Sequence, residues 1–228
     1  MDDDRRPKPH WEDRDEPAWA EFRFQQPYAK GLERLRRDVL SRPDFDPAVL
    51  WQWGTMQAMA VVEILRSVEE RWGAEGQRVV GEALRRIGRD VGRQILEGAA
   101  LPESASEAEV ASFYATVINR IPYASIEEPR IEDDSKVSFD IVWCPHQDHY
   151  GAFDCRVQRY LVQGMIDAAG ERPGGSSLKG WEVRFDSTIP SGAPTCHFTL
   201  WRATSEEREA WARVTELIEA KALARARK

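Results

Sequence analysis

Apolar residues recur with the period of a helix through the first half of the chain. In the clearest run, intervals of four, three, four and four residues separate Val80, Leu84, Ile87, Val91 and Ile95. This spacing places the five side chains on one face of a helix that covers about 75–97. Similar runs predict helices over 30–40, 47–72 and 107–120.

Helix ends are also visible in this part of the chain. Gly73 stands between the two longest apolar runs and is a natural C-terminal stop for the first of them. Ser106 and Glu109 form a capping box at the start of the helix over 107–120. We therefore expect separate helices and not one continuous rod.

From residue 130 onward, strand patterns appear between the helices. Val137, Phe139, Ile141 and Trp143 alternate with polar residues, which is typical of a half-buried strand, and a partner strand begins near Arg130. Two further alternating runs, over 181–188 and 195–202, predict an antiparallel hairpin. Helices are expected over 151–169 and 204–225.

The order of these elements predicts an α+β fold, in which N-terminal helices precede an antiparallel sheet that helices cover. We divide the chain into an N-terminal arm over 1–45, partly disordered, an α+β domain over 46–204 and a C-terminal helix over 205–228. Four tryptophans, Trp11, Trp19, Trp51 and Trp53, lie in the first quarter of the chain. Packing is their simplest interpretation, and the alternative is that they anchor the arm to the body or to a second subunit.

Three glycines, Gly81, Gly88 and Gly92, form a stripe beside the apolar face of the helix over 75–97. Glycine costs about 1 kcal/mol inside a helix, so three on one side indicate that another backbone approaches closely. That backbone belongs either to the same subunit or to a second copy. Together with the aromatic arm, this stripe favours a homodimer.

The net charge is 32 − 39 = −7, and the isoelectric point is near 5.3. This balance argues against a nucleic-acid binder or an anionic-membrane binder, because both need a concentrated basic surface. No apolar run approaches the roughly 18–20 residues that span a bilayer, and the first residues are too polar for a secretory signal. The odd count of three cysteines favours a reducing, cytoplasmic location. A small molecule is the expected substrate.

The stretch "VWCPHQDHYGAFDCRVQ" collects most of the candidate chemistry. Cys144 ends a predicted strand, His146 and His149 follow in a turn, and Cys155 lies near the start of the next helix, where a thiol is biased toward thiolate. Cys196 lies in the last predicted strand. A strand end, a helix start and an adjacent strand can meet at one edge of a sheet.

Three interpretations of these residues stay open. The cysteines are small buried apolar residues, as free cysteines often are. Alternatively, Cys144, Cys155, Cys196 and His146 bind zinc or iron, although no C-x-x-C pair supports this. In the third interpretation Cys155 is a nucleophile, with His146, His149 or Asp154 moving protons. Asp154 is equally well explained as a turn or capping residue.

The segments "WCPHQDHYGAFDCRVQRYLVQGM" and "WEVRFDSTIPSGAPTCHFTLW" resemble the L-2-amino-thiazoline-4-carboxylic acid hydrolase family, itself similar in outline to 4-vinyl reductase domains. The resemblance covers about 50–203, and its pattern falls on Cys144, Pro145, Cys155, Gly192 and Cys196. In related domains such cysteines can bind metal, which the resemblance therefore allows here.

The resemblance implies that the chain opens the ring of a small heterocyclic acid, of thiazoline or cyclic amidine type, by adding water to a C=N carbon. That reaction needs an activated nucleophile, a proton donor for the leaving heteroatom and a cation for the carboxylate. Arg156 and Arg159 are candidate cations, unless they are merely solvated. The alternative is a non-catalytic small-molecule-binding or sensor module of the 4-vinyl reductase type.

Overall fold

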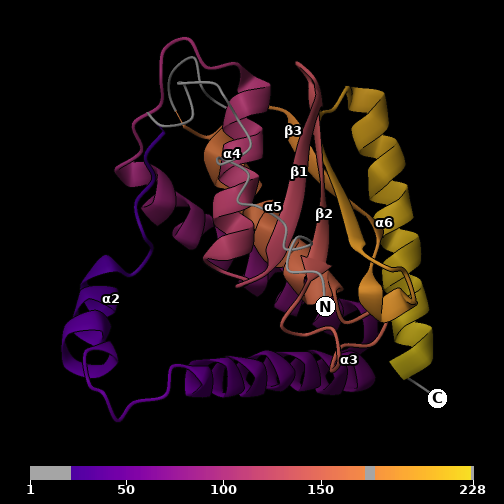
Figure 1. Cartoon of the computed structure of the whole chain (residues 1–228). Coiled ribbons are helices and arrows are strands. Elements are labelled where there is room, and N and C mark those ends of the chain that lie inside the picture. The colour runs from indigo at the N-terminus through magenta and orange to yellow at the C-terminus, as the bar shows by residue number, and fades with distance from the viewer. Residues whose placement is uncertain (1–21, 173–177, 227–228) are drawn as a thin grey trace.

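The predicted N-terminal helices are present in the computed structural model, which describes residues 22–172 and 178–226. Helix α2 (Ala29–Leu35) continues into a π-helical turn, η2 (Arg36–Leu40), and α3 spans Ala48–Glu97. Within α3, Gly73 has φ 60° and ψ −137°, a backbone conformation that is not helical. The element is therefore two helices that meet at an angle, as predicted from Gly73 (Figure 1). Trp11 and Trp19 lie outside the described residues.

The remaining helices are α4 (Glu107–Arg120), α5 (Arg156–Gly170) and α6 (Ser205–Ala226). The predicted capping box at the start of α4 is confirmed by reciprocal hydrogen bonds between Ser106 and Glu109. Helix α5 begins later than the predicted residue 151, because 151–155 form turns instead. In the described part of the chain, no helix has both the length and the apolar character needed to cross a bilayer.

Four strands form one antiparallel sheet in the order β1-β2-β4-β3. They are β1 (Ile126–Asp133), β2 (Lys136–Trp143), β3 (Trp181–Ser187) and β4 (Cys196–Arg202). The predicted hairpin and the predicted partner of β2 are both confirmed, and the chain has the α+β fold. Phe198 of β4 pairs with Phe139 on one side and Phe185 on the other, with ring centroids 5.0 and 4.1 Å apart.

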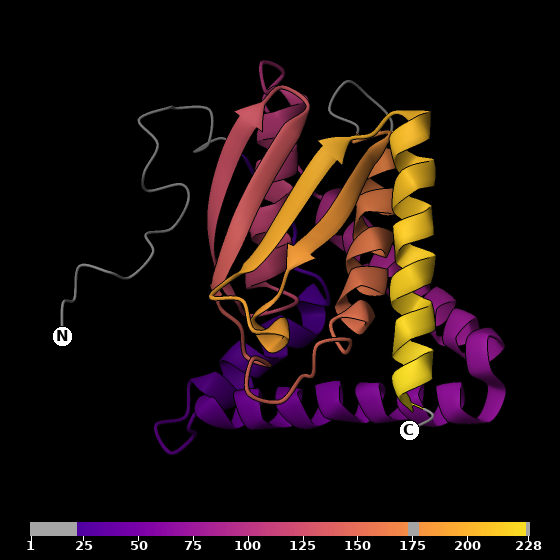
Figure 2. The same cartoon turned by 90° about the vertical axis from the view of Figure 1, so that its right-hand side faces the viewer.

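Helices cover one face of this sheet. Helix α4 packs on β1 and β2, α5 packs on β3, and the second part of α3 lies against α5 as a third layer (Figure 2). The main core, between the sheet and the helices, includes Ile95, Tyr114, Met165 and Val183. Helix α6 runs along the side of the molecule, and its Val214 is exposed.

The glycine stripe packs within the subunit. A Cβ atom on Gly88 would lie 2.0 Å from the carbonyl oxygen of Leu161 in α5, and one on Gly164 would lie 2.1 Å from the carbonyl oxygen of Arg85. The two helices therefore touch backbone to backbone. The backbone that was predicted to approach the glycine stripe is therefore that of α5 in the same subunit. The stripe is no longer a reason to expect a dimer.

A smaller apolar cluster holds the first part of α3 to the body. Val62 and Leu65 are almost fully buried and pack with Tyr150 and Val157, together with Leu84 from the second part of α3. Tyr150 belongs to the turns that precede α5. This cluster is one of the contacts through which the first part of α3 meets the rest of the chain.

Candidate functional site

Successive turns carry the chain from the end of β2 to the start of α5. The amides of His149 and Tyr150 both donate to the carbonyl of His146 at 3.0 Å, and the amide of Asp154 donates to the carbonyl of Gly151 at 3.0 Å. These turns fold the segment back under the sheet. Side chains only a few residues apart consequently reach different surroundings, either a cavity or solvent.

A mostly apolar cavity of about 60 Å³ lies between the sheet and the helices α4 and α5. Cys144, Cys155 and Cys196 all line it, as do His146 and Tyr150. Three cysteines that are distant in sequence thus belong to the wall of one cavity. Aromatic and aliphatic side chains from β2, β3, β4, α4 and α5 form the rest of the wall.

His146 lines this cavity, and one of its ring nitrogens has no hydrogen-bond partner among the described residues. Its ring stacks on that of Tyr150, with centroids 4.8 Å apart and planes 14° from parallel. The Nδ1 atom is buried and has no hydrogen-bond partner among the described residues. Burial, and secondarily the neighbouring His149, lower the pKa of His146 below its ordinary value, so the imidazole is neutral near pH 7.

The cysteine thiols are not activated by their surroundings. Burial raises the pKa of Cys155 to about 12 and that of Cys196 to about 11, and it raises the pKa of Cys144 as well. Cys155 is the N-cap of α5, but its side chain makes no capping hydrogen bond. The expected thiolate bias at the helix start was therefore wrong, because loss of solvation outweighs the attraction of the helix terminus.

These raised pKa values predict slow alkylation. At pH 8 a thiol with a pKa near 12 holds about a thousandth of the usual thiolate, and its higher intrinsic nucleophilicity offsets only part of that loss. We expect Cys155 to react with iodoacetamide tens of times more slowly than a free cysteine under the same conditions. Mass spectrometry of tryptic peptides over time measures this rate, and the urea-unfolded protein is the control. Labelling of native Cys155 at the unfolded rate would contradict it.

The remaining predicted residues lie away from the cavity. His149 is exposed, with its ring centroid 6.2 Å from that of Trp51 in α3. Asp154 is buried and accepts hydrogen bonds from the Gly151 amide and from Arg66, both at 2.7 Å. Its carboxylate lines a separate polar hollow, not the cysteine cavity. The structure thus brings together the cysteines and His146, but not His149 or Asp154.

In the part of the chain that the structure describes, no group of three or more His, Cys, Asp or Glu side chains is arranged to hold a metal ion. The zinc or iron site of Cys144, Cys155, Cys196 and His146 stays a prediction. Metal analysis of the purified protein is the measurement that tests it.

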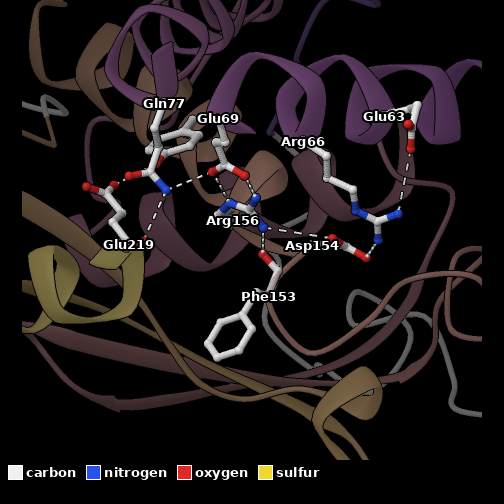
Figure 3. Close-up of polar contacts among 9 residues, drawn as sticks. Glu63, Arg66, Glu69, Gln77, Phe153, Asp154, Arg156 and Glu219 are labelled. Carbon is white, nitrogen blue, oxygen red and sulfur yellow. Dashed lines mark hydrogen bonds and ion pairs between the residues drawn. The ribbon is translucent and has the colours of Figure 1, made fainter. Parts of the chain in front are cut away.

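A buried ionic network beside the cavity was not predicted. Arg156 donates to both oxygens of Glu69, at 3.2 and 2.5 Å, and Gln77 donates to the same carboxylate at 2.8 Å (Figure 3). Glu69 and Arg156 are almost completely buried. The one sequence signal was the position of Glu69, which lies seven residues after Val62 and four after Leu65 and so falls on the buried side of α3.

Both arginines proposed as carboxylate ligands are buried and paired. Arg159 donates to Thr215 at 2.8 Å and to Glu219 at 3.0 Å, both in α6. Arg156 and Arg159 also line a second hollow of about 190 Å³, and Cys155 lies in the wall of both this hollow and the cysteine cavity. Cys155 therefore stands between an apolar space and one that contains cationic side chains.

Residues 53–200 match the sequence pattern of the family described as L-2-amino-thiazoline-4-carboxylic acid hydrolase. The chain belongs to this family. The match contains every residue that lines the cysteine cavity, and it supports, at family level, a hydrolase that acts on a thiazoline carboxylic acid.

Two further similarities accompany this family membership. A protein of Archaeoglobus fulgidus, described as uncharacterized, is 52% identical over 219 residues, which are 95% of this chain and 96% of that one. A structure of trafficking protein particle complex subunit 3 from Naegleria fowleri, covalently bound to palmitic acid, is similar with a TM-score of 0.45 and 10% identity. It covers 65% of this chain and 93% of that one. The likeness to 4-vinyl reductase domains stays a prediction.

Proposed function

We propose that this chain opens the ring of a small heterocyclic carboxylic acid, of thiazoline or cyclic amidine type, and that the ring binds in the cysteine cavity. The family membership supports the reaction class. The observation that carries the proposal is His146, which lines the cavity as a neutral imidazole and whose buried Nδ1 has no hydrogen-bond partner among the described residues. A histidine in this state is suited to accept a proton from water.

The size of the cavity supports a small ring. At roughly 10–15 Å³ for each water position, 60 Å³ holds about four to six waters, which is close to the bulk of a five-membered ring. Its apolar wall suits the carbon and sulfur atoms of a thiazoline. A long chain or a fused ring system would need the wall to open.

The proposed reaction follows from these positions. His146 takes a proton from a water molecule, whose oxygen bonds to the C=N carbon of the ring. The electron pair of the C=N π bond moves onto the ring nitrogen, which takes the remaining proton of the added hydroxyl as the C=O bond forms. The bond from that carbon to the leaving ring heteroatom breaks with its electron pair on the heteroatom, and the protonated imidazole returns its proton to this leaving atom. Cys155 is not required as a nucleophile, because its raised pKa keeps the thiol protonated.

The carboxylate of the substrate needs a place outside the cysteine cavity. None of the described residues that line the cavity is a lysine or an arginine. The neighbouring hollow contains Arg156 and Arg159, and Cys155 lies in the wall that both spaces share. We place the carboxylate toward that hollow, whose wall contains the two arginines, Ser187 and Thr188, as well as Asp186.

We expect His146→Ala to lower kcat/KM for ring opening by about a hundredfold to ten-thousandfold, the usual contribution of a general base. For the unmodified protein, kcat/KM falls as the pH falls through the lowered pKa of His146, because the protonated ring cannot accept a proton, and it is level above that pKa. Chromatographic product analysis with 2-amino-thiazoline-4-carboxylate and related cyclic amidines measures both effects.

The matched control is His149→Ala, which removes an exposed histidine from the same turn and should leave kcat/KM unchanged. Activity that survives His146→Ala in a folded variant would exclude this histidine as the base. No turnover of any thiazoline or cyclic amidine by the unmodified protein would remove the substrate class as well.

A second candidate function is a non-catalytic module that binds a small apolar ligand. The observation that favours it is the wall of the cavity, which has no charged side chain among its described residues. Thermal-shift measurements with thiazolines, cyclic amidines and phenols, followed by product analysis, separate the two. A ligand that raises Tm and is recovered unchanged indicates the module.

A further inference from the structure

Large apolar side chains are exposed along the first part of α3, on the face that points away from the body. Helix positions 49, 53, 56, 60 and 64 are separated by four, three, four and four residues, which puts them on one stripe. We call this stripe the outer face of α3, and it consists of Val49, Trp53, Met56, Ala60 and Ile64. All five residues are exposed, Trp53 by 61% and Met56 by 63%.

The outer face lies opposite the side of α3 that meets the body. The buried residues Val62, Leu65 and Glu69 are about half a turn away around the helix. Figures 1 and 2 show the first part of α3 along one end of the molecule, with the sheet and the other helices on one side of it. No described element covers the outer face.

This helix also lacks the charges that normally keep an exposed helix apart from other proteins. Between Asp46 and Glu63 no residue is charged. A solvated helix face usually carries charged or polar residues. Exposed Trp and Met in an uncharged setting are instead typical of the central part of a protein interface.

We propose that the outer face of α3 binds the outer face of a second copy of this chain, in an antiparallel arrangement about a twofold axis. This surface is independent of the proposed function. A twofold interface uses the same patch on both copies, so a patch must complement itself. Here the small Ala60 leaves room for Trp53 of the second copy.

The area is sufficient for such a contact. If a tryptophan presents about 250 Å² when fully exposed, Trp53 alone offers roughly 150 Å². The five side chains of the outer face together offer roughly 500 Å² for each copy, or about 1,000 Å² for the pair, which is the lower bound for a specific interface. Flanking residues such as Leu50 and Gln57, both exposed, add to it.

The charges at the two ends of the helix favour the antiparallel arrangement. Exposed Asp46 stands just before the outer face, and exposed Arg71 stands beyond its far end. Antiparallel packing places Asp46 of each copy near Arg71 of the other. Parallel packing would place like charges together at both ends, which is unfavourable.

Sedimentation equilibrium of the full chain tests the proposal. We expect a mass near twice 26.1 kDa at micromolar concentration. Trp53→Glu and Met56→Glu should each raise the dimer dissociation constant more than tenfold, and circular dichroism should show an unchanged fold, because both side chains are exposed. The matched control is Trp72→Glu, which changes a tryptophan that is 57% exposed on the same helix but off the outer face, and it should leave the mass at the dimer value.

A monomer at all concentrations would overturn the proposal, whether the outer face is then covered by residues 1–21, by a membrane or by nothing. A dimer that Trp53→Glu weakens no more than Trp72→Glu does would also overturn it. Arg71→Asp should weaken the dimer a few-fold, and Asp46→Arg added to it should restore the affinity. A double variant no better than Arg71→Asp would reject the antiparallel arrangement.

Discussion

Gly88→Ala is expected to lower the free energy of unfolding by about 3 kcal/mol or more, at the upper end of the usual cost of overpacking. The added methyl group would lie 2.0 Å from the carbonyl oxygen of Leu161, which is backbone and cannot rotate away. Helices α3 and α5 would have to separate. Urea denaturation followed by circular dichroism measures the change, with the slope compared between variants.

The matched control for this prediction is Gly54→Ala in the same helix α3. A methyl group on Gly54 would meet nothing within 4 Å. Alanine should therefore stabilise the helix there by about 0.5–1 kcal/mol through its lower backbone entropy in the unfolded state. If Gly88→Ala cost less than 1 kcal/mol, the backbone contact between the two helices would be wrong.

Breaking the buried pair between Glu69 and Arg156 is expected to cost a similar amount. Replacing either residue alone by alanine leaves the other charge buried without compensation, and such changes typically cost about 3–5 kcal/mol. The double variant Glu69→Ala with Arg156→Ala should cost less than the sum of the single changes, because no unpaired charge remains. Urea unfolding of the four proteins gives the coupling energy.

Glu75→Ala is the control for this pair. Glu75 also binds an arginine, Arg78, but both side chains are exposed, and its loss should change stability little. A change at Glu69 no larger than the change at Glu75 would show that the buried pair is solvated or absent. Additive single variants would show that Gln77 and Phe153, which also contact the pair, compensate it fully.

Secondary structure was largely readable from periodicity, because each element has one apolar face. The two-residue period of β2 and the capping box at Ser106 each correspond to an element in the structure. The first residue of α5 could not be predicted from the sequence. Residues 151–155 have helix-compatible composition, but the Asp154 carboxylate accepts from the Gly151 amide and holds a turn in their place.

The residues of the cavity wall could be predicted only in part, since His149 and Asp154 lie elsewhere, and their chemistry could not be predicted. A strand end, a helix start and a neighbouring strand do converge, and this brings Cys144, Cys155 and Cys196 to one cavity. The direction of the Cys155 pKa shift depends on burial by residues elsewhere in the chain, which local sequence does not reveal. The partner of Arg156 was also hidden, since Glu69 lies 87 positions away.

The angle of α3 at Gly73 has a mechanical consequence. The first part of α3, with 25 residues between Ala48 and Trp72, is a lever about 37 Å long. A rotation of 10° about Gly73 would move the Ala48 end of this helix by roughly 6 Å. This part of α3 is held to the body by the ion pairs of Arg66 and Glu69 and by the cluster of Val62 and Leu65 with Tyr150. The ring of His146 stacks on that same Tyr150. The first part of α3 and the cavity wall thus share Tyr150, so a movement of one displaces the other through this side chain.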